Sequence, residues 1–391
     1  MTLPVLLRGG TVLDVRTASW VREDLLLDGG LVAARGTAAP ADVTVVDATG
    51  LLVTPGLVDA QVNGAAGVDL TRSPERTADV ARALVRYGVT AFVPTVVTAP
   101  AGTVEAALAA AGALGDDGAA PGARARVVGV HAEGPFLSPA RRGAHPPAHL
   151  RTPDPALVAG WSRAAGLVTA TVAPELPGAL DLVRDLVARG VAVWVGHTEA
   201  TYEQVGAAVA AGAVAVTHLF NAMPGLGHRE PGLVGAALGD GTLVAGLIVD
   251  GLHVHPAVVR AARGALRPDR LMLVSDTTAA LGLPDGPTVL GDHDVVLEAG
   301  AVRLASDGVT LAGSGVGLDH CVRTFVAMTG CDPAEAFVAA TRVPADLLGR
   351  PDLGRLDPGA AADVALWTPD LALAGVLVAG TPVRTVTRSE A

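Results

Sequence analysis

The sequence predicts an α/β protein: a (β/α)₈ barrel of the TIM type, with a small β-sandwich domain built from both chain ends. Two observations predict this class. Apolar runs of roughly four to eight residues recur through the middle of the chain and alternate with stretches of helical period, which is typical of a parallel sheet covered by helices. Shorter strand-like runs, punctuated by glycine turns, occupy both ends of the chain.

The strand-like runs at the two ends predict the small domain. The first group lies at 5–7, 11–15, 25–27, 31–33 and 43–46, separated by glycine pairs and Thr-Gly turns typical of hairpins. A second group, 362–367 and 373–379, follows an Asp-Pro-Gly turn near the C-terminus. We expect residues 1–54 to form a small antiparallel sheet, and residues 354–391 to pair with it.

Eight apolar runs predict the barrel, which we place at residues 55–353. They begin near Gly56, Thr90, Val127, Leu167, Val191, Ala213, Thr242 and Leu271. Eight βα units over about 240 residues match the repeat of a TIM barrel. The first intervening helix should start at Ser73-Pro74-Glu75, with Ser73 as its cap, and end at Gly88. An open doubly wound sheet is the competing architecture, but no Gly-x-Gly-x-x-Gly follows the first run.

Composition narrows the class of protein. The net charge of −11 and the absence of a basic run argue against nucleic-acid binding. No apolar run reaches the roughly 20 residues that span a bilayer, and no signal peptide opens the chain. The two cysteines, Cys321 and Cys331, are too few for a disulfide scaffold. We therefore expect a cytoplasmic protein. All 28 basic residues are Arg, so no lysine nucleophile or carboxylated-lysine metal bridge is available.

Polar residues at the ends of the runs predict a metal site. Glu133, His197 and His218 end the third, fifth and sixth runs, and Asp276 ends the eighth. A lone strand-end histidine is usually structural, but the carboxyl ends of barrel strands converge on one mouth. Two imidazoles and a carboxylate with an open position form a catalytic zinc shell. Asp276 could then accept a proton from water.

The sequence segments around the ends of these runs also resemble those of one protein family. The chain is similar to the N-acetylglucosamine-6-phosphate deacetylases of the amidohydrolase superfamily, over nearly its whole length. The matching strings are Pro55–Gly64, His131–Phe136, Gly196–Thr198, His218–Met223, Arg229–Gly232, Asp250–His253 and Val274–Asp276. The resemblance implies that Glu133, His197 and His218 hold the metal and that Asp276 is the catalytic acid/base.

The resemblance also implies the substrate contacts. These are Ala144, His145, Asn221, Ala222, Arg229, Asp250, His253 and the segment Leu311-Ala312-Gly313, expected to be a loop whose backbone lies against a sugar. His145 is a candidate catalytic residue that stabilises an oxyanion, although it could equally be a surface-loop histidine. Arg229 is the main candidate phosphate anchor, since guanidinium binds phosphate oxygens in pairs. His253 is the second.

One departure from the superfamily predicts the number of metals. Many members carry His-x-His at the end of the first strand and a carboxylated lysine, which together support two ions. This chain has Gln61 and Asn63 at those positions and no lysine, and amides are poor zinc ligands. We expect one divalent ion per subunit, Zn²⁺ first, although Fe²⁺, Co²⁺ and Mn²⁺ tolerate the same ligands.

The expected reaction is metal-dependent hydrolysis of N-acetylglucosamine 6-phosphate, a small amino-sugar phosphate, to glucosamine 6-phosphate and acetate. The resemblance further implies a homodimer with a subunit boundary near the phosphate. The alternatives are another amidohydrolase, such as a dihydroorotase-like or nucleobase-deaminase-like enzyme, and an inactive homologue that binds sugar phosphates. The galactosamine and mannosamine epimers of the substrate also remain open.

Overall fold

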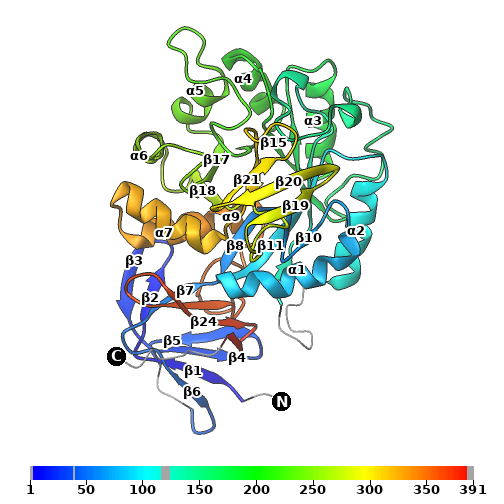
Figure 1. The fold of residues 1–391 in the computed structure, drawn as a ribbon. Coiled ribbons are helices and arrows are strands. Elements are labelled where there is room, and N and C mark those ends of the chain that lie inside the picture. The colour runs from blue at the N-terminus through cyan, green and yellow to red at the C-terminus, as the bar shows by residue number, and fades with distance from the viewer. Residues whose placement is uncertain (1–2, 38–39, 116–123, 385–391) are drawn as a thin grey trace.

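The predicted architecture is confirmed in a computed structural model, which describes residues 3–37, 40–115 and 124–384 (Figure 1). Eight parallel strands form the barrel, and each falls within one of the eight predicted runs. They are β8 (Leu57–Val62), β11 (Val89–Val97), β13 (Val130–Glu133), β14 (Leu167–Val172), β15 (Ala192–Val195), β16 (Ala215–Val216), β17 (Val244–Ile248) and β18 (Leu271–Val274). The short strand β12 (Arg126–Val127) pairs with β11.

The two edges of the barrel sheet meet just beyond the ends of β8 and β18. Val62 and Thr277 form a parallel bridge, and the Asn63 N–H donates to the Thr277 carbonyl at 2.7 Å. All residues of β8, β11, β13, β14 and β18 are buried. Burial on both faces explains why these strands are apolar without alternation. Closure brings Gln61 and Asn63 beside Asp276.

Helices surround the barrel (Figure 1). They are α1 (Thr77–Leu84), α2 (Thr103–Leu114), α3 (Ala179–Ala188), α4 (Tyr202–Ala210), α5 (Gly232–Gly239), α6 (Pro256–Ala265), α7 (Leu318–Thr329), α8 (Pro333–Ala340) and α9 (Arg342–Leu347), with 3₁₀ turns at Pro74–Arg76, Val85–Tyr87, Pro139–Arg141 and Pro147–His149. The predicted Ser73 cap is wrong, because the Ser73 side chain makes no capping bond to the 3₁₀ turn that begins there. Within the described ranges, none of the helices has the length and apolarity to cross a bilayer.

Two sheets pack below the barrel and contain strands from both chain ends. One has the order β5-β4-β1-β6 and the other β25-β24-β23-β7-β2-β3. Their members are β1 (Val5–Arg8), β2 (Thr11–Asp14), β3 (Ser19–Arg22), β4 (Leu25–Asp28), β5 (Leu31–Arg35), β6 (Thr44–Asp47), β7 (Leu52–Pro55), β23 (Val364–Trp367), β24 (Leu373–Val378) and β25 (Thr381–Arg384).

The expectation of a purely antiparallel N-terminal sheet is wrong. β1 pairs with β6 in parallel, and so does β2 with β7. Each of these pairs is joined through several intervening strands rather than by a tight turn, and only such crossovers allow parallel pairing. The domain boundaries stay a prediction, and residues 385–391 lie outside the described ranges.

An antiparallel sheet that the sequence analysis did not anticipate interrupts the barrel after β18. It contains β19 (Gly286–Leu290), β20 (His293–Glu298), β21 (Ala301–Leu304) and β22 (Leu311–Ser314), and lies across the barrel in Figure 1. The Ser314 N–H donates to the Asp276 carbonyl at 2.9 Å, which attaches β22 to the end of β18. A smaller hairpin, β9 (Gly64–Ala65) and β10 (Val68–Asp69), follows β8.

Trp367 of β23 packs where the small domain meets the barrel, as does Trp20 of β3. The Trp367 side chain is fully buried, its Nε1–H donates to Thr54 Oγ1 at 2.9 Å, and its ring centroid lies 5.1 Å from that of Phe337 in α8. Because truncation of a buried aromatic leaves a cavity, Trp367→Ala should lower the free energy of unfolding by about 3–5 kcal/mol. Urea denaturation measures this. Trp367→Phe, which keeps a ring but loses the hydrogen bond and part of the buried indole, should still cost clearly less; equal losses would contradict this account.

Candidate active site

Three side chains from the ends of β13, β15 and β16 meet at the mouth of the barrel. Glu133 ends β13, while His197 and His218 follow β15 and β16 by two residues. His197 Nε2 lies 3.0 Å from His218 Nε2, and Glu133 Oε1 lies 3.3 Å and 3.2 Å from these two atoms. All three residues are at most 5 % exposed. The structure therefore brings together the three predicted metal ligands.

The spacing of these donor atoms fits a divalent ion. A tetrahedral ion with ligand bonds of about 2.0–2.1 Å has ligand-to-ligand edges of about 3.3–3.4 Å, close to the distances in the cluster. His197 Nδ1 donates to the Arg141 carbonyl at 2.9 Å, which leaves the lone pair of Nε2 facing the cluster. Among the described residues, these three alone form a group of histidine, cysteine or acidic side chains suited to a metal.

The polypeptide adopts an uncommon conformation where it delivers these side chains. His197, His218 and Asp276 have positive φ values of 49°, 26° and 50°. Non-glycine residues rarely occupy this region and do so at a cost of about 1–3 kcal/mol. Each of the three follows a barrel strand, so the reversal of φ turns its side chain into the mouth.

Asp276 presents one carboxylate oxygen to protein donors and the other to the pocket. Oδ1 accepts from Asn63 Nδ2 at 2.7 Å and from Gln61 Nε2 at 3.1 Å. Within the described residues Oδ2 has no hydrogen-bond donor, and Asp276 lines the same pocket as the three-ligand cluster. Burial, together with the charge of Glu133, raises the pKa of Asp276 to about 7. A carboxylate in this state can exchange protons near neutral pH.

His145 lies in the pocket, not on the surface, and its tautomer is set by Thr98. Its Nδ1 accepts from the Thr98 backbone N–H at 3.1 Å, so the ring proton of a neutral His145 sits on Nε2. Nε2 lies 4.0 Å from Glu133 Oε2. Burial, the largest cause, holds the pKa of His145 well below its usual range. His145 is therefore neutral, with an N–H donor facing the site.

The pocket has a volume of about 230 Å³ and contains most of the predicted substrate contacts. Those that line it are Ala144, His145, Asn221, Ala222, His253, Leu311 and Gly313. Leu311 and Gly313 belong to strand β22, so the expectation of a loop there is wrong.

Three predicted substrate contacts do not line the pocket. Asp250 instead holds His253: its Oδ2 accepts from His253 Nδ1 at 2.7 Å. Ala312 is 1 % exposed, between two residues that do line the pocket. Arg229 is exposed in the segment 224–231 before α5, which projects from the barrel in Figure 1. Of the two predicted phosphate anchors, only His253 lies in the pocket of its own chain.

Other lining residues were missed in the sequence analysis. Leu290 and Thr310 reach the pocket from the inserted sheet, and Gly143 from the segment before His145. The sequence signal for the sheet was weak, because β20 alternates exposed and buried residues in the structure while its sequence, His-Asp-Val-Val-Leu-Glu, does not alternate in polarity. Thr98, at the end of β11, carries no such signal, because its role depends on contact with His145.

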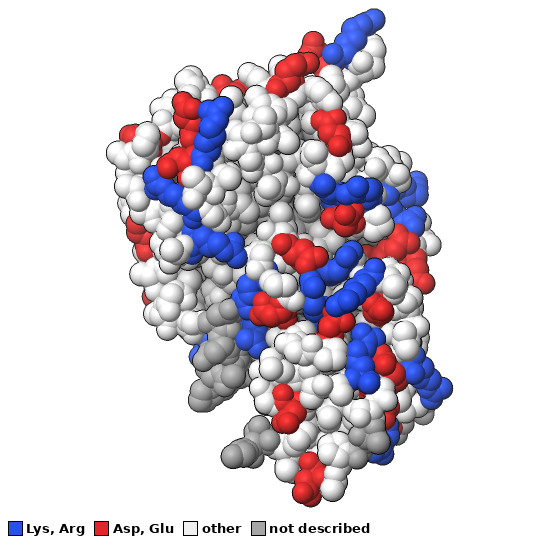
Figure 2. All heavy atoms as spheres, turned by 180° about the vertical axis from the view of Figure 1, so that it is seen from behind, with Lys and Arg blue, Asp and Glu red and all other residues white. Residues whose placement is uncertain are grey.

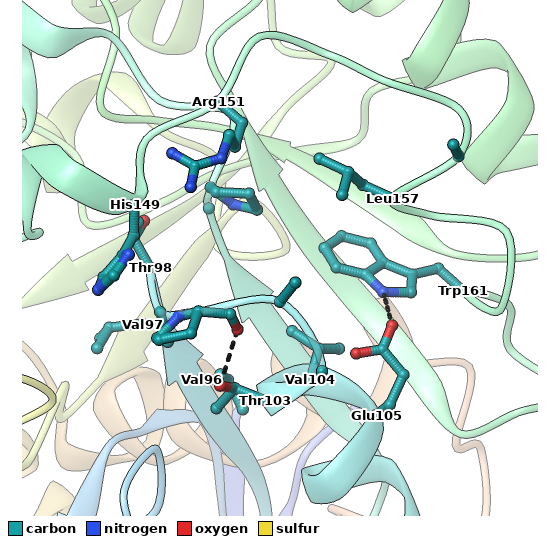
Figure 3. Close-up of a pocket in the computed structure, with 17 residues that line it drawn as sticks. Val96, Val97, Thr98, Thr103, Val104, Glu105, His149, Arg151, Leu157 and Trp161 are labelled. Atoms are coloured by element: carbon teal, nitrogen blue, oxygen red, sulfur yellow. Dashed lines mark hydrogen bonds between the residues drawn. The ribbon is translucent and has the colours of Figure 1, made fainter.

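Thr98 also lines a second cavity of about 250 Å³ (Figure 3), which shares Val97 with the pocket of the site. Arg151, Leu157 and Trp161 line that cavity, and the Trp161 Nε1–H donates to Glu105 Oε1 at 3.1 Å. The Thr98 hydroxyl donates to the Glu133 carbonyl at 3.3 Å. None of the predicted site residues lines this second cavity.

The geometry of His145 gives a testable expectation. Replacing His145 with Phe removes the Nε2–H donor, and loss of one such donor to a developing oxyanion typically lowers kcat by about 10²–10³-fold. Thr98→Val keeps the backbone N–H that sets the tautomer, so its kcat should fall much less. Steady-state acetate release measures both. Equal kcat for His145→Phe and the wild type would exclude this role for His145.

The surface on the side turned away from the viewer in Figure 1 carries both positive and negative side chains. On the face shown in Figure 2, Arg side chains of the described residues lie among Asp and Glu side chains, without a broad basic patch on that face. Many arginines of the described residues are paired with acidic side chains, as in Arg263 with Glu335 at 2.9 Å. This face does not have the basic surface that nucleic-acid binding requires.

A TIM-type barrel with a buried His₂Glu cluster and an adjacent carboxylate defines a class of metal-dependent hydrolases. The chain belongs to the amidohydrolase family, which matches residues 52–389. An N-acetylglucosamine-6-phosphate deacetylase from Rattus norvegicus is 36% identical over 389 residues, covering 96% of this chain and 93% of the relative. An N-acetylgalactosamine-6-phosphate deacetylase from Escherichia coli O157:H7 is 40% identical over 331 residues, covering 83% and 86%.

Solved structures give the same result. A mutant of the N-acetyl-D-glucosamine-6-phosphate deacetylase from Mycobacterium smegmatis, in complex with N-acetyl-D-glucosamine-6-phosphate, superimposes with a TM-score of 0.88 at 36% identity. The alignment covers 98% of this chain and all of that chain. The family and the buried cluster together imply a divalent metal in this site.

Proposed function

We propose that this protein hydrolyses the N-acetyl amide of N-acetylglucosamine 6-phosphate, releasing glucosamine 6-phosphate and acetate. The observation that carries the proposal is the placement of Asp276 and His145 in one pocket with the His₂Glu cluster. Relatives at 36% identity over almost the whole chain have this activity in their names, and the mycobacterial relative was solved with this substrate. The two cysteines of the present protein are free and buried, which is compatible with a cytoplasmic location.

The polar residues of the cluster and its surroundings divide the steps of this reaction. Glu133, His197 and His218 would hold one Zn²⁺, which polarises an amide carbonyl and makes water more acidic. Asp276 accepts the proton of the attacking water at Oδ2 and returns it to the departing amine nitrogen. The His145 Nε2–H donates to the carbonyl oxygen as negative charge develops there. His253, oriented by Asp250, contacts the phosphate.

A substrate panel tests this proposal. We expect acetate release from N-acetylglucosamine 6-phosphate with a kcat/KM at least ~10²-fold above that for the unphosphorylated sugar, because charge-assisted hydrogen bonds to the phosphate are lost in the latter. Equal values would remove the phosphate role. N-acetylgalactosamine 6-phosphate is the second candidate, since one relative is named for it; it and the mannosamine epimer belong in the same panel.

We also propose that the protein acts as a homodimer in which Arg229 reaches the site of a second copy. Arg229 lies outside its own pocket, on a projecting segment that also exposes 61 % of Leu226. An exposed apolar side chain beside an unburied phosphate anchor is suited to an interface. In such a dimer each pocket would hold His253 of its own chain and Arg229 of the other.

A mixing experiment distinguishes this arrangement from a single-chain site. Arg229→Ala should raise KM by about 10–100-fold with little change in kcat, and Arg267→Ala, another exposed arginine, should change neither. Co-refolded Arg229→Ala and Asp276→Asn chains should regain low-KM activity, because each mixed dimer contains one site with both groups. No regain in verified mixed dimers would place Arg229 in its own chain's site or outside catalysis.

A further inference from the structure

The amide of Gln61 lies between the two carboxylates of the site. Its Nε2 donates to Glu133 Oε1 at 3.0 Å and to Asp276 Oδ1 at 3.1 Å. Gln61 is fully buried within β8, and its backbone carbonyl accepts from the Asp276 N–H at 3.1 Å. One side chain therefore joins a candidate metal ligand to the candidate acid/base, and the roles proposed above do not include it.

The orientation of this amide follows from its surroundings. Its Oε1 is buried and has no hydrogen-bond partner in the described part of the chain. A rotation of the amide by 180° would place that oxygen against two carboxylates and lose both donations. An unpaired buried oxygen is itself destabilising. The two hydrogen bonds that the NH₂ group donates therefore account for this orientation of the amide.

The charges explain why a neutral double donor suits this position. Glu133 and Asp276 are acidic groups in a buried site, and burial together with the charge of Glu133 raises the pKa of Asp276. An NH₂ group satisfies one oxygen of each carboxylate without adding charge. A shorter or apolar side chain would leave both oxygens with one donor fewer, and Asp276 Oδ1 would keep only the donation from Asn63.

We propose that Gln61 is a positioning residue that fixes Glu133 for metal binding and Asp276 for proton transfer, through one N–H donated to each. This inference rests on the proposed hydrolase function. It predicts a double defect, since partners that orient a metal ligand typically contribute about 10–100-fold to metal affinity or activity. Asn63 differs, because its Nδ2 donates to Asp276 and not to Glu133.

The decisive comparison uses Gln61→Met, which keeps the length of the side chain and removes the donors. Zn²⁺ affinity is measured on the metal-free protein by competition with a chromophoric chelator, and kcat and KM on the reloaded enzyme. We expect the Zn²⁺ Kd to rise and kcat to fall, each by about 10–100-fold, with KM within about twofold. Asn63→Leu should lower kcat and leave the Zn²⁺ Kd unchanged.

Two further variants keep the result interpretable. Gln204→Met alters the other glutamine of the chain, which caps α4 and does not line the pocket, and should match the wild type in Kd and kcat. Gln61→Asn retains an amide but is one methylene too short to bridge both carboxylates. It should reproduce the double defect if Gln61→Met does not fold.

The outcomes separate this inference from the function on which it rests. A wild-type protein that binds no metal and releases no acetate would overturn the proposed function. A wild type that does both, with Gln61 variants that bind Zn²⁺ equally well and turn over equally fast, would overturn the positioning role. A defect confined to kcat would remove the link to Glu133, and with it the proposal as stated.

Discussion

Asp276→Asn should lower kcat by about 10³-fold while the protein keeps its metal and its fold. General acid–base catalysis contributes about 10²–10⁴-fold, and the asparagine side chain cannot accept a proton at neutral pH. The substitution is nearly isosteric, and its carbonyl oxygen can still accept from Asn63 and Gln61 as Oδ1 does. Acetate release and metal analysis of the purified variant measure the two parts of this expectation.

The pH profile gives a second measure of the same role. A base must be ionised, so kcat/KM should fall as the pH drops through the pKa of Asp276. Burial and the charge of Glu133 raise that pKa to about 7, and a cation bound at Glu133 opposes the second cause, so the acid limb should lie somewhat below pH 7. The Asp276→Asn variant should lack this limb.

A matched control is available in α7. Asp319 is also largely buried and pairs with Arg323 at 2.9 Å, but it does not line the pocket. Asp319→Asn should therefore keep wild-type kcat and its acid limb. Near-wild-type turnover of Asp276→Asn, with metal bound, would remove Asp276 from the mechanism.

Topology explains why the centre of the site could be predicted from sequence. Glu133, His197, His218 and Asp276 are up to 143 residues apart (276 − 133), yet each lies at the end of a strand of one parallel barrel or two residues beyond it. The carboxyl ends of such strands lie around one mouth of the barrel. Residues that follow the apolar runs in the sequence are therefore close together in space. No further information is needed to bring them together.

The rest of the site depends on contacts that this rule does not describe. The double donation by Gln61 depends on how the last strand meets the first, which the run ends alone do not define. Leu290 and Thr310 come from an inserted sheet whose position relative to the mouth is set by backbone bonds at Ser314. Asp250 affects the pocket through His253, and the proposed role of Arg229 in a second copy's site cannot be read from the strand ends of one chain.

Loss of a metal ligand should have the other large effect. His218→Ala removes one of three donors from a buried cluster, so we expect less than about 0.1 equivalent of metal in the purified variant and a kcat at least ~10³-fold lower. His293→Ala, a histidine on β20 outside the pocket, should bind one metal per chain and turn over normally. Two tightly bound ions in the wild type would contradict the one-metal site that Gln61 and Asn63 predict.

Chelation should reproduce this defect reversibly in the wild type. Metal-free protein should lack activity, and add-back of Zn²⁺, Fe²⁺, Co²⁺ and Mn²⁺ in turn identifies the metals that restore it. Because the ion binds the folded state, free metal at about 100 times its Kd adds about 2.7 kcal/mol to the free energy of unfolding. Calorimetry should therefore show a higher Tm with metal for the wild type and not for His218→Ala. Activity that survives complete chelation would instead require Asp276 and His145 to act without a metal, which would refute the metal-dependent mechanism while leaving the fold and family unchanged.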